Sequence, residues 1–263
     1  MAITTLDGII AAPSQRVSYL KTGARTAVAS SAFALFDVSG APTGTLAVGN
    51  TANGIFPSHT IAGYPKLNAF AGGATGYLNS VEFSGTVASR LLVWDCLFSA
   101  GAYAFNANTT LASQPSYAAR VPSSDYKGLE LWFEAVTAFT GNPTVTVTYT
   151  NQDGTTGRTT GAIATGMTPI VGRMIRLPLQ AGDTGIQKIE SVTCAVSTAG
   201  TFNIHVMRKL WTGRVRSNND GDTHDFTKTG LPIVYDTSAL RVAIAPDSTA
   251  VGVSELQIDI ING

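Results

Sequence analysis

The sequence predicts an all-β protein with an antiparallel sandwich or barrel domain; the preferred prediction is an antiparallel, jelly-roll-like β-sandwich with an extended, irregular N-terminal segment. The first observation is alternation: between residues 129 and 210, several segments switch between apolar and polar residues with the period of two of a half-buried strand. In residues 144–150, Val145, Val147 and Tyr149 would face a core while the threonines face outward. The second observation is that turn compositions rich in Gly, Asn and Asp separate these segments, at residues 141–143, 151–154, 181–183 and 199–200.

The N-terminal part, residues 1–60, differs from the rest of the chain. It is dominated by Ala, Gly, Ser, Thr and Pro, and its apolar residues form short clusters. Such a segment packs poorly alone, so it predicts either an arm laid along a neighbouring subunit or edge strands joined by long loops, and a mixture of arm and strand is preferred. Residues 24–36 are also compatible with a short helix.

A sandwich domain is predicted over residues 61–212. A loop at 70–76 precedes a strand at 77–84, and the mostly apolar residues 91–98 suit a central strand covered on both faces. Asp95 lies within that strand and would therefore need a partner. Residues 99–126 are expected to be irregular because Pro115 and Pro122 forbid a long regular element. Further strands are then predicted, at residues 129–136, 144–150, 175–179, 189–196 and 201–210.

The remaining residues, 213–263, are predicted to form a loop and closing strands. Basic residues at 208–216 precede Asp220, Asp222 and Asp225, which predicts local charge pairing. Strand patterns follow at 241–245 and 255–260. The final strand would pair within the fold or add to the sheet of a neighbouring subunit.

The composition excludes several classes of function. Charged residues make up 13% of the 263 residues, about half the usual ~25%, and 17 basic residues balance 17 acidic ones. The chain thus offers no general attraction for nucleic acid or anionic lipid. A neutral surface rich in Thr, Ser and Ala lacks charge repulsion between copies, which favours a surface covered by partners.

No secretory signal or membrane span is expected from the sequence, so synthesis and folding in a cytoplasm are predicted. Cys96 and Cys194 each lie in an apolar run, which predicts two buried free thiols, although the sequence alone leaves a disulfide open.

Residues for hydrolytic chemistry are sparse, and we predict no catalytic, cofactor-binding or metal site. Among the histidines His59, His205 and His224, none lies in a catalytic motif. His205 falls on the outward parity of its strand, which predicts a surface or interface residue. Glu130 and Glu134 share one strand face but lie roughly 13 Å apart along it, too far for a glycosidase pair on one strand.

Two binding alternatives remain open. Residues 218–225 are acidic, as in a calcium loop, but Gly221 falls at the fourth place and no Glu follows at the twelfth, so a solvated turn is preferred. Trp132 would serve a sugar-binding platform if it were exposed beside a second aromatic ring. The alternation of apolar and polar residues does not show whether Trp94 or Trp211 supplies that ring. Packing of Trp132 in the fold or in a subunit interface is preferred.

Residues 144–210 resemble structural proteins of tailed-bacteriophage virions. The segments that carry the resemblance are turns and strands at 146–159, 172–185, 189–193 and 200–202, with a weaker echo at 91–95, where such proteins carry a strand that ends in an acidic turn. The resemblance covers about half of the chain and implies a virion component, either a capsid decoration (cement) protein or a neck or tail component.

The functional prediction is a non-enzymatic virion protein assembled in a bacterial host. Its partners would be the major capsid protein or other virion proteins and further copies of itself, as a trimer or ring, without cofactors, nucleic acid or membrane. A carbohydrate-binding receptor module is the alternative from another class.

Overall fold

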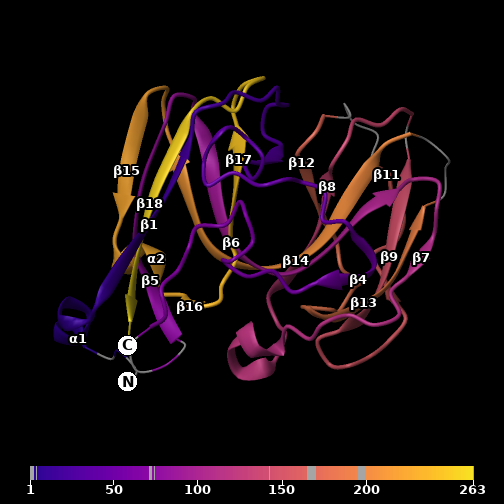
Figure 1. The fold of residues 1–263 in the computed structure, drawn as a ribbon, viewed down its shortest axis with the longest axis horizontal. Helices are drawn as coiled ribbons and strands as arrows, with labels where there is room; N and C mark the ends of the chain where they lie inside the picture. Colours follow the sequence, from indigo (N-terminus) through magenta and orange to yellow (C-terminus); the bar gives the residue numbers. More distant parts are fainter. Residues whose placement is uncertain are drawn as a thin grey trace.

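The computed structural model describes residues 3, 5–70, 73, 75–141, 143–164, 170–194 and 199–262. Antiparallel strands dominate it, which confirms the predicted all-β sandwich class (Figure 1). The structure also shows an arrangement that alternation alone does not specify: two outer sheets flank a closed barrel. Figure 1 shows the outer sheets at opposite ends of the long axis.

The first sheet has the strand order β15-β5-β18-β1-β3, with β16 also paired to β5. It joins the beginning of the chain to its end, because the central strand β1 pairs along its whole length with β18. The members are β1 (Ser14–Lys21), β3 (Gly40–Ala41), β5 (Thr75–Gly85), β15 (Asp220–His224), β16 (Ile233–Tyr235) and β18 (Ser254–Asn262).

The barrel has the order β14-β8-β12-β2-β17-β6 and closes because β14 also pairs with β6; β4 extends it beside β6. Three register irregularities interrupt the β14–β6 pairing, and such bulges bend and twist strands. The members are β2 (Ala32–Ala34), β4 (Asn50–Ile55), β6 (Ser89–Ala104), β8 (Leu129–Ala135), β12 (Arg173–Leu177), β14 (Thr201–Val215) and β17 (Leu240–Pro246).

The second sheet has the order β10-β9-β13-β7, with β11 also paired to β9. Short helical turns complete the fold: α1 (Leu6–Ala11), α2 (Phe226–Thr229) and the 3-10 turns η1 (Ala118–Arg120) and η2 (Pro122–Ser124). The sheet members are β7 (Thr109–Thr110), β9 (Thr144–Asn151), β10 (Arg158–Thr159), β11 (Ile163–Ala164) and β13 (Ile186–Cys194).

Three hydrophobic cores follow from this layering. One lies between the first sheet and the barrel, and a second lies between the barrel and the second sheet. The third fills the barrel interior around Trp94, Trp132 and Met207. The long strands β6 and β14 contribute to all three cores, which is why they are covered on both faces.

The alternating segments have the packing that their pattern predicts. Val145, Val147 and Tyr149 of β9 are each 0% exposed and belong to the core between barrel and second sheet. The segments predicted as strands at 77–84, 91–98, 129–136, 144–150, 175–179, 189–196, 201–210, 241–245 and 255–260 correspond to β5, β6, β8, β9, β12, β13, β14, β17 and β18. Residues 195 and 196 of that list, and Asn142 of the predicted turn, lie outside the described residues.

Three predictions need correction. The strand part of the mixture of arm and strand predicted for residues 1–60 is confirmed, but residues 14–55 are no arm, because β1 to β4 lie in the first sheet and the barrel and bury side chains such as Tyr19 and Phe33. Residues 24–36 form no helix and instead supply β2. Residues 99–126 are not wholly irregular, since β6 continues to Ala104 and pairs there with β14.

None of the helices among the described residues has the length and apolar character required to cross a membrane.

Two N-terminal deletions test the incorporation of β1 and β2. Deletion of residues 1–60 should prevent folding, because it removes β1 and β3 of the first sheet and β2 and β4 of the barrel sheet. Deletion of residues 1–12 should leave the thermal unfolding midpoint nearly unchanged, because α1 buries no residue. Circular dichroism melts and size-exclusion chromatography measure both outcomes; a cooperative melt of the 61–263 chain would contradict this assignment.

Candidate functional site

The barrel interior holds the carboxylates and the tryptophan singled out in the sequence. Glu130, Trp132 and Glu134 alternate along β8 with residues of the second core and therefore point into the barrel. Trp132 is 8% exposed, and its ring meets that of Trp94 edge-on, with centroids 5.1 Å apart. Both indole Nε1 groups donate to Glu130 Oε2 at 2.9 Å. Trp132 is thus part of the fold, the preferred alternative.

Glu134 is the centre of a sealed polar cluster. Its carboxylate forms an ion pair with Arg241 of β17 and accepts a hydrogen bond from the Asn203 amide at 2.9 Å. His205 Nε2 lies 3.0 Å from Glu134 Oε2. Glu134, Asn203 and His205 are 0% exposed and Arg241 is 2% exposed. Buried charges of this kind persist when they are paired and hydrogen-bonded, as they are here.

His205 also connects Glu134 to two nucleophile-type side chains. Ser99 Oγ lies 2.8 Å from His205 Nδ1, and Cys96 Sγ lies 3.2 Å from Ser99 Oγ. A Ser–His–carboxylate chain has the order of a hydrolase triad. All four side chains are nevertheless between 0% and 2% exposed, so a substrate has no access to them in this conformation.

The prediction that His205 is a surface or interface residue was wrong. The alternation in β14 is correct, but the face opposite the second core is the barrel interior and not solvent. A sequence signal existed in two polar residues of the neighbouring strand β8, Glu130 and Glu134, which face the barrel interior and had no predicted partners.

The cluster shifts the pKa values of its members. Burial alone would raise the pKa of Glu134, but the Arg241 guanidinium and the His205 ring outweigh it and hold the pKa at about 2. Burial and Arg241 oppose protonation of His205, yet the Glu134 carboxylate and hydrogen bonds raise its pKa above the ordinary value. Burial opposes ionisation of Cys96, but hydrogen bonding with His205 lowers the pKa of this thiol.

A second buried ion cluster surrounds Asp95, which confirms the need for a partner. The carboxylate accepts from Ser238 Oγ at 2.8 Å and from the Ala239 backbone N–H at 3.1 Å. Arg120 and Arg208 lie 3.3 and 3.4 Å away. Asp95 lies within β6, unlike the acidic turn that the resemblance implies, and Arg208 pairs here and not with the acids at 220–225.

The acidic segment at 218–225 forms β15 and the cap of a short helix. Asp225 accepts hydrogen bonds from the backbone N–H groups of Thr227 and Lys228, which caps α2. Asp222 lies 3.8 Å from Lys228 Nζ. Among the described residues there is no cluster of three or more His, Cys, Asp or Glu side chains that could hold a metal ion. The solvated-turn prediction therefore needs correction, because residues 220–224 are a strand that pairs with β5 and only residues 218 and 219 form a turn.

The remaining histidines and the third tryptophan make local contacts. His59 Nδ1 accepts from the Leu67 backbone N–H at 3.1 Å, and His224 Nδ1 accepts from the Trp211 indole at 3.1 Å. Trp211 is 3% exposed, so all three tryptophans are buried and none can contribute to an exposed sugar platform. Cys96 and Cys194 are free thiols, as predicted; Cys96 is buried and Cys194 half-buried.

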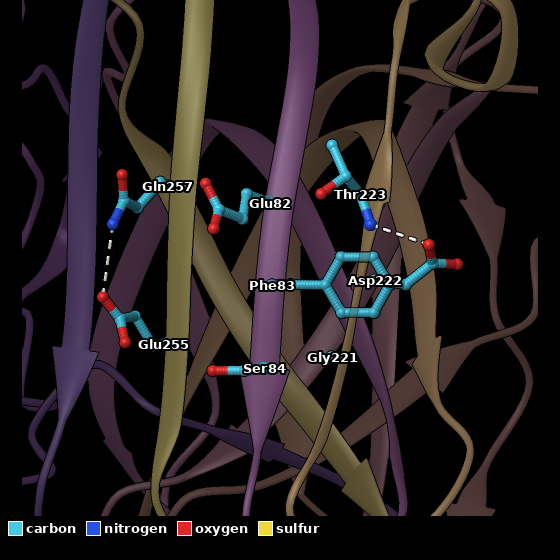
Figure 2. A pocket seen from close by; sticks show the side chains of 8 residues that line it. All are labelled: Glu82, Phe83, Ser84, Gly221, Asp222, Thr223, Glu255 and Gln257. Carbon is cyan, nitrogen blue, oxygen red and sulfur yellow. Dashed lines mark hydrogen bonds between the residues drawn. The ribbon is translucent and has the colours of Figure 1, made fainter.

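The outer face of the first sheet presents a shallow polar groove of about 280 Å³. Figure 2 shows the Glu82, Glu255 and Gln257 side chains on the open face of β5 and β18, with Asp222 and Thr223 across the groove on β15. The dashed lines mark hydrogen bonds from Gln257 to Glu255 and from the Thr223 backbone to Asp222. This face can contact a polar surface, and nothing in it encloses a substrate.

Apolar side chains are exposed in a different region. The large apolar residues exposed among the described residues are Leu6, Ile10, Leu20 and Ile61. Leu6 and Ile10 lie on α1, which buries none of its residues. Ile61 lines a groove of about 500 Å³ beside β1 and β3, and Leu20 lies on β1 opposite Ala41. Helix α1 and the groove beside Ile61 are the strongest candidates for a functional surface.

Comparisons with known proteins give no family assignment. No protein-family model and no curated protein matches the chain. The solved structures that it resembles include infectious bursal disease virus VP2 in a subviral particle, with 10% identity over 96% of this chain and 80% of that chain, at a TM-score of 0.23. The same virus's T=1 particles give 11% identity, coverage of 95% and 77%, and a TM-score of 0.16.

A third structure, the T13 particle of that virus, gives 15% identity over 94% of this chain and 39% of that chain, at a TM-score of 0.13. These neighbours come from infectious bursal disease virus and not from a tailed bacteriophage. TM-scores of this size do not establish a shared fold.

Substitution of Glu134 by Gln tests the sealed cluster. E134Q leaves the Arg241 guanidinium buried without its counter-charge, so the free energy of unfolding near pH 5–6 should fall by about 3–5 kcal/mol. The exposed control E255Q should change it by less than about 0.5 kcal/mol. Urea denaturation measures both, and a loss for E134Q no greater than for E255Q would contradict the role of the ion pair.

The pH dependence follows from the directions of the pKa shifts. Glu134 has a depressed pKa, so its contribution is present above the unfolded value of about 4.3 and is lost as pH falls towards about 2. His205 has a raised pKa, so its contribution is present below about pH 6.5 and is lost as pH rises through the folded value. The stability gap between wild type and E134Q should therefore be widest between about pH 4.3 and 6.5; a gap independent of pH would refute this coupling.

Proposed function

We propose that this protein is a non-enzymatic structural component of a virion, and that it acts as a capsid decoration or cement protein. It would stabilise a shell through repeated contacts with the major capsid protein and with further copies of itself. The resemblance of residues 144–210 to virion proteins of tailed bacteriophages supports this proposal, as do the contacts described below.

The observation that carries the proposal is helix α1. None of its six residues is buried, and its large apolar side chains Leu6 and Ile10 are 56% and 75% exposed. A helix this short is marginal in water unless packing stabilises it. Leu6, Ile9 and Ile10 share one helical face at positions i, i+3 and i+4. Ile9 is half-buried by its own chain, whereas Leu6 and Ile10 remain exposed and are available for contact with a neighbouring subunit.

The buried polar groups support a role without catalysis. The side chains that could act as nucleophile, base or acid in the barrel pair with one another and are closed off from solvent. Their ion pairs and hydrogen bonds stabilise the packing of a barrel that is covered on two sides. A rigid body of this kind suits a protein whose task is to present fixed contact surfaces.

The surface composition supports assembly. With 13% charged residues and a formal net charge of zero, the protein has little electrostatic repulsion between copies. Many weak contacts repeated over a lattice add up through avidity, so each contact can be small. A neck or tail ring would use the same properties, and it remains the alternative position within the virion.

Incorporation of a truncated chain into particles tests this function. Particles assembled with the chain lacking residues 1–12 should carry at least about tenfold fewer copies than particles assembled with the full chain, because the docking helix is missing. Quantitative mass spectrometry of purified particles measures the copy number, with circular dichroism showing that the truncated chain is folded. The T156D variant, altered at an exposed loop residue remote from α1, should be incorporated normally.

Two results would refute the proposal. Absence of the full-length chain from purified particles would reject a virion role. Normal incorporation of the folded 13–263 chain would reject α1 as the docking element.

A further inference from the structure

Helix α1 and the groove beside Ile61 have complementary chemistry. The groove holds about 500 Å³ and includes Pro42, Ile61, Ala62 and Pro65 in its lining. Its walls are therefore largely apolar, and Ile61 is still 37% exposed. Helix α1 presents Leu6, Ile9 and Ile10 on one face. Amphipathic helices commonly bind by laying such a face into an apolar groove.

Charge complementarity supports the same pairing. Arg16 and Lys66 contribute to the lining of the groove, and neither forms an ion pair with another described residue. Asp7 lies in the first turn of α1 beside the apolar stripe, is exposed, and likewise has no ion pair among the described residues. A helix carrying one acid and an apolar face thus matches a groove with apolar walls and two basic residues.

The exposed apolar residues divide between these two surfaces. Of the four large apolar side chains exposed among the described residues, Leu6 and Ile10 lie on the helix and Ile61 lies in the groove. The fourth, Leu20, shares the outward face of β1 with Arg16 and pairs with Ala41, which also lines the groove. Leu20 itself lines a different groove, with Val253 and Glu255, so docking of α1 in the Ile61 groove would cover the other three.

No residue of α1 is among those that line the groove in the same chain. Ala12 is extended, with φ −66° and ψ 135°, and the following Pro13 disfavours continuation of the helix across this junction. The backbone N–H of Asn262 donates to the Pro13 carbonyl at 2.8 Å, which fixes the start of β1 against β18. Figure 1 shows α1 projecting beyond the end of the first sheet. The groove beside β1 is therefore open to the helix of another molecule.

We propose that α1 of one copy docks in the groove beside Ile61 of a second copy of this chain, so that subunits are joined by exchange of their N-terminal helices. This inference rests on the proposed function, because it names the partner of the docking helix. It concerns contact between copies and requires no other virion protein, so it can be tested on the purified chain.

Sedimentation velocity over a range of concentrations tests the exchange. The purified full-length chain should self-associate, and I10D on the helix and I61D in the groove should each weaken association roughly ten- to hundredfold, because either change places a carboxylate in an apolar contact. Both positions are exposed in the single chain, so both variants should fold, as circular dichroism checks. The exposed control T156D should associate like wild type.

One mixing experiment and one charge-reversal experiment make the assignment of helix to groove specific. I10D retains an intact groove and I61D an intact helix, so an equimolar mixture should associate more tightly than either variant alone. D7K should weaken association through repulsion by Arg16 and Lys66, and D7K combined with K66D should recover most of the loss. A general surface effect would show neither recovery.

A wild-type chain that is monomeric at every concentration would overturn the inference, as would association that I10D weakens and I61D leaves unchanged. If the chain enters particles but behaves in either of these ways, the helix exchange fails while the proposed function stands. If the purified chain exchanges helices as described but is absent from particles, the exchange stands and the proposed function fails.

Discussion

The pairing of β6 with β14 is the constraint on which the rest of the structure depends, because it closes the barrel. Once closed, the barrel has an inner face that solvent does not reach and an outer face that two further sheets cover. Every polar side chain directed inward must then find a partner inside. The Glu134–Arg241 ion pair with His205 and Asn203, and the shared indole acceptor Glu130, satisfy that requirement.

Much of the fold could be predicted from the sequence, because alternation reports directly on a strand with two different faces. It placed β8, β9 and β14 and identified Val145, Val147 and Tyr149 as core residues. Alternation does not report what covers the polar face, which is why the prediction for His205 was wrong and why the sequence left both a sandwich and a barrel open. Closure of the barrel depends on the pairing of β6 with β14, in which partners such as Ser99 and His205 are more than 100 residues apart. The local sequence carries no signal for such a pairing.

The N-terminal segment shows that local composition also fails to reveal pairing with a distant strand. Its Ala- and Gly-rich composition resembled an arm, but β1 is held by a partner at the other end of the chain, β18, and its inward residues complete the first core. The part that does project is much shorter, and its boundaries have local signals: Thr5 accepts from the Gly8 backbone N–H as an N-cap, and Pro13 follows the helix. Helix α1 thus lies outside the paired strands, in a segment whose start and end are marked by local sequence signals.

An assembly subunit needs a rigid body and at least one contact that is incomplete in the single chain. The three cores provide the body, and α1 with the groove beside Ile61 provides the incomplete contact. Cryo-electron microscopy of purified particles that carry this chain would test that claim most directly. The account predicts ordered copies of the chain at repeating positions, with each α1 lying in the Ile61 groove of a neighbouring copy. Particles without density for the chain, or with α1 packed on its own groove, would contradict it.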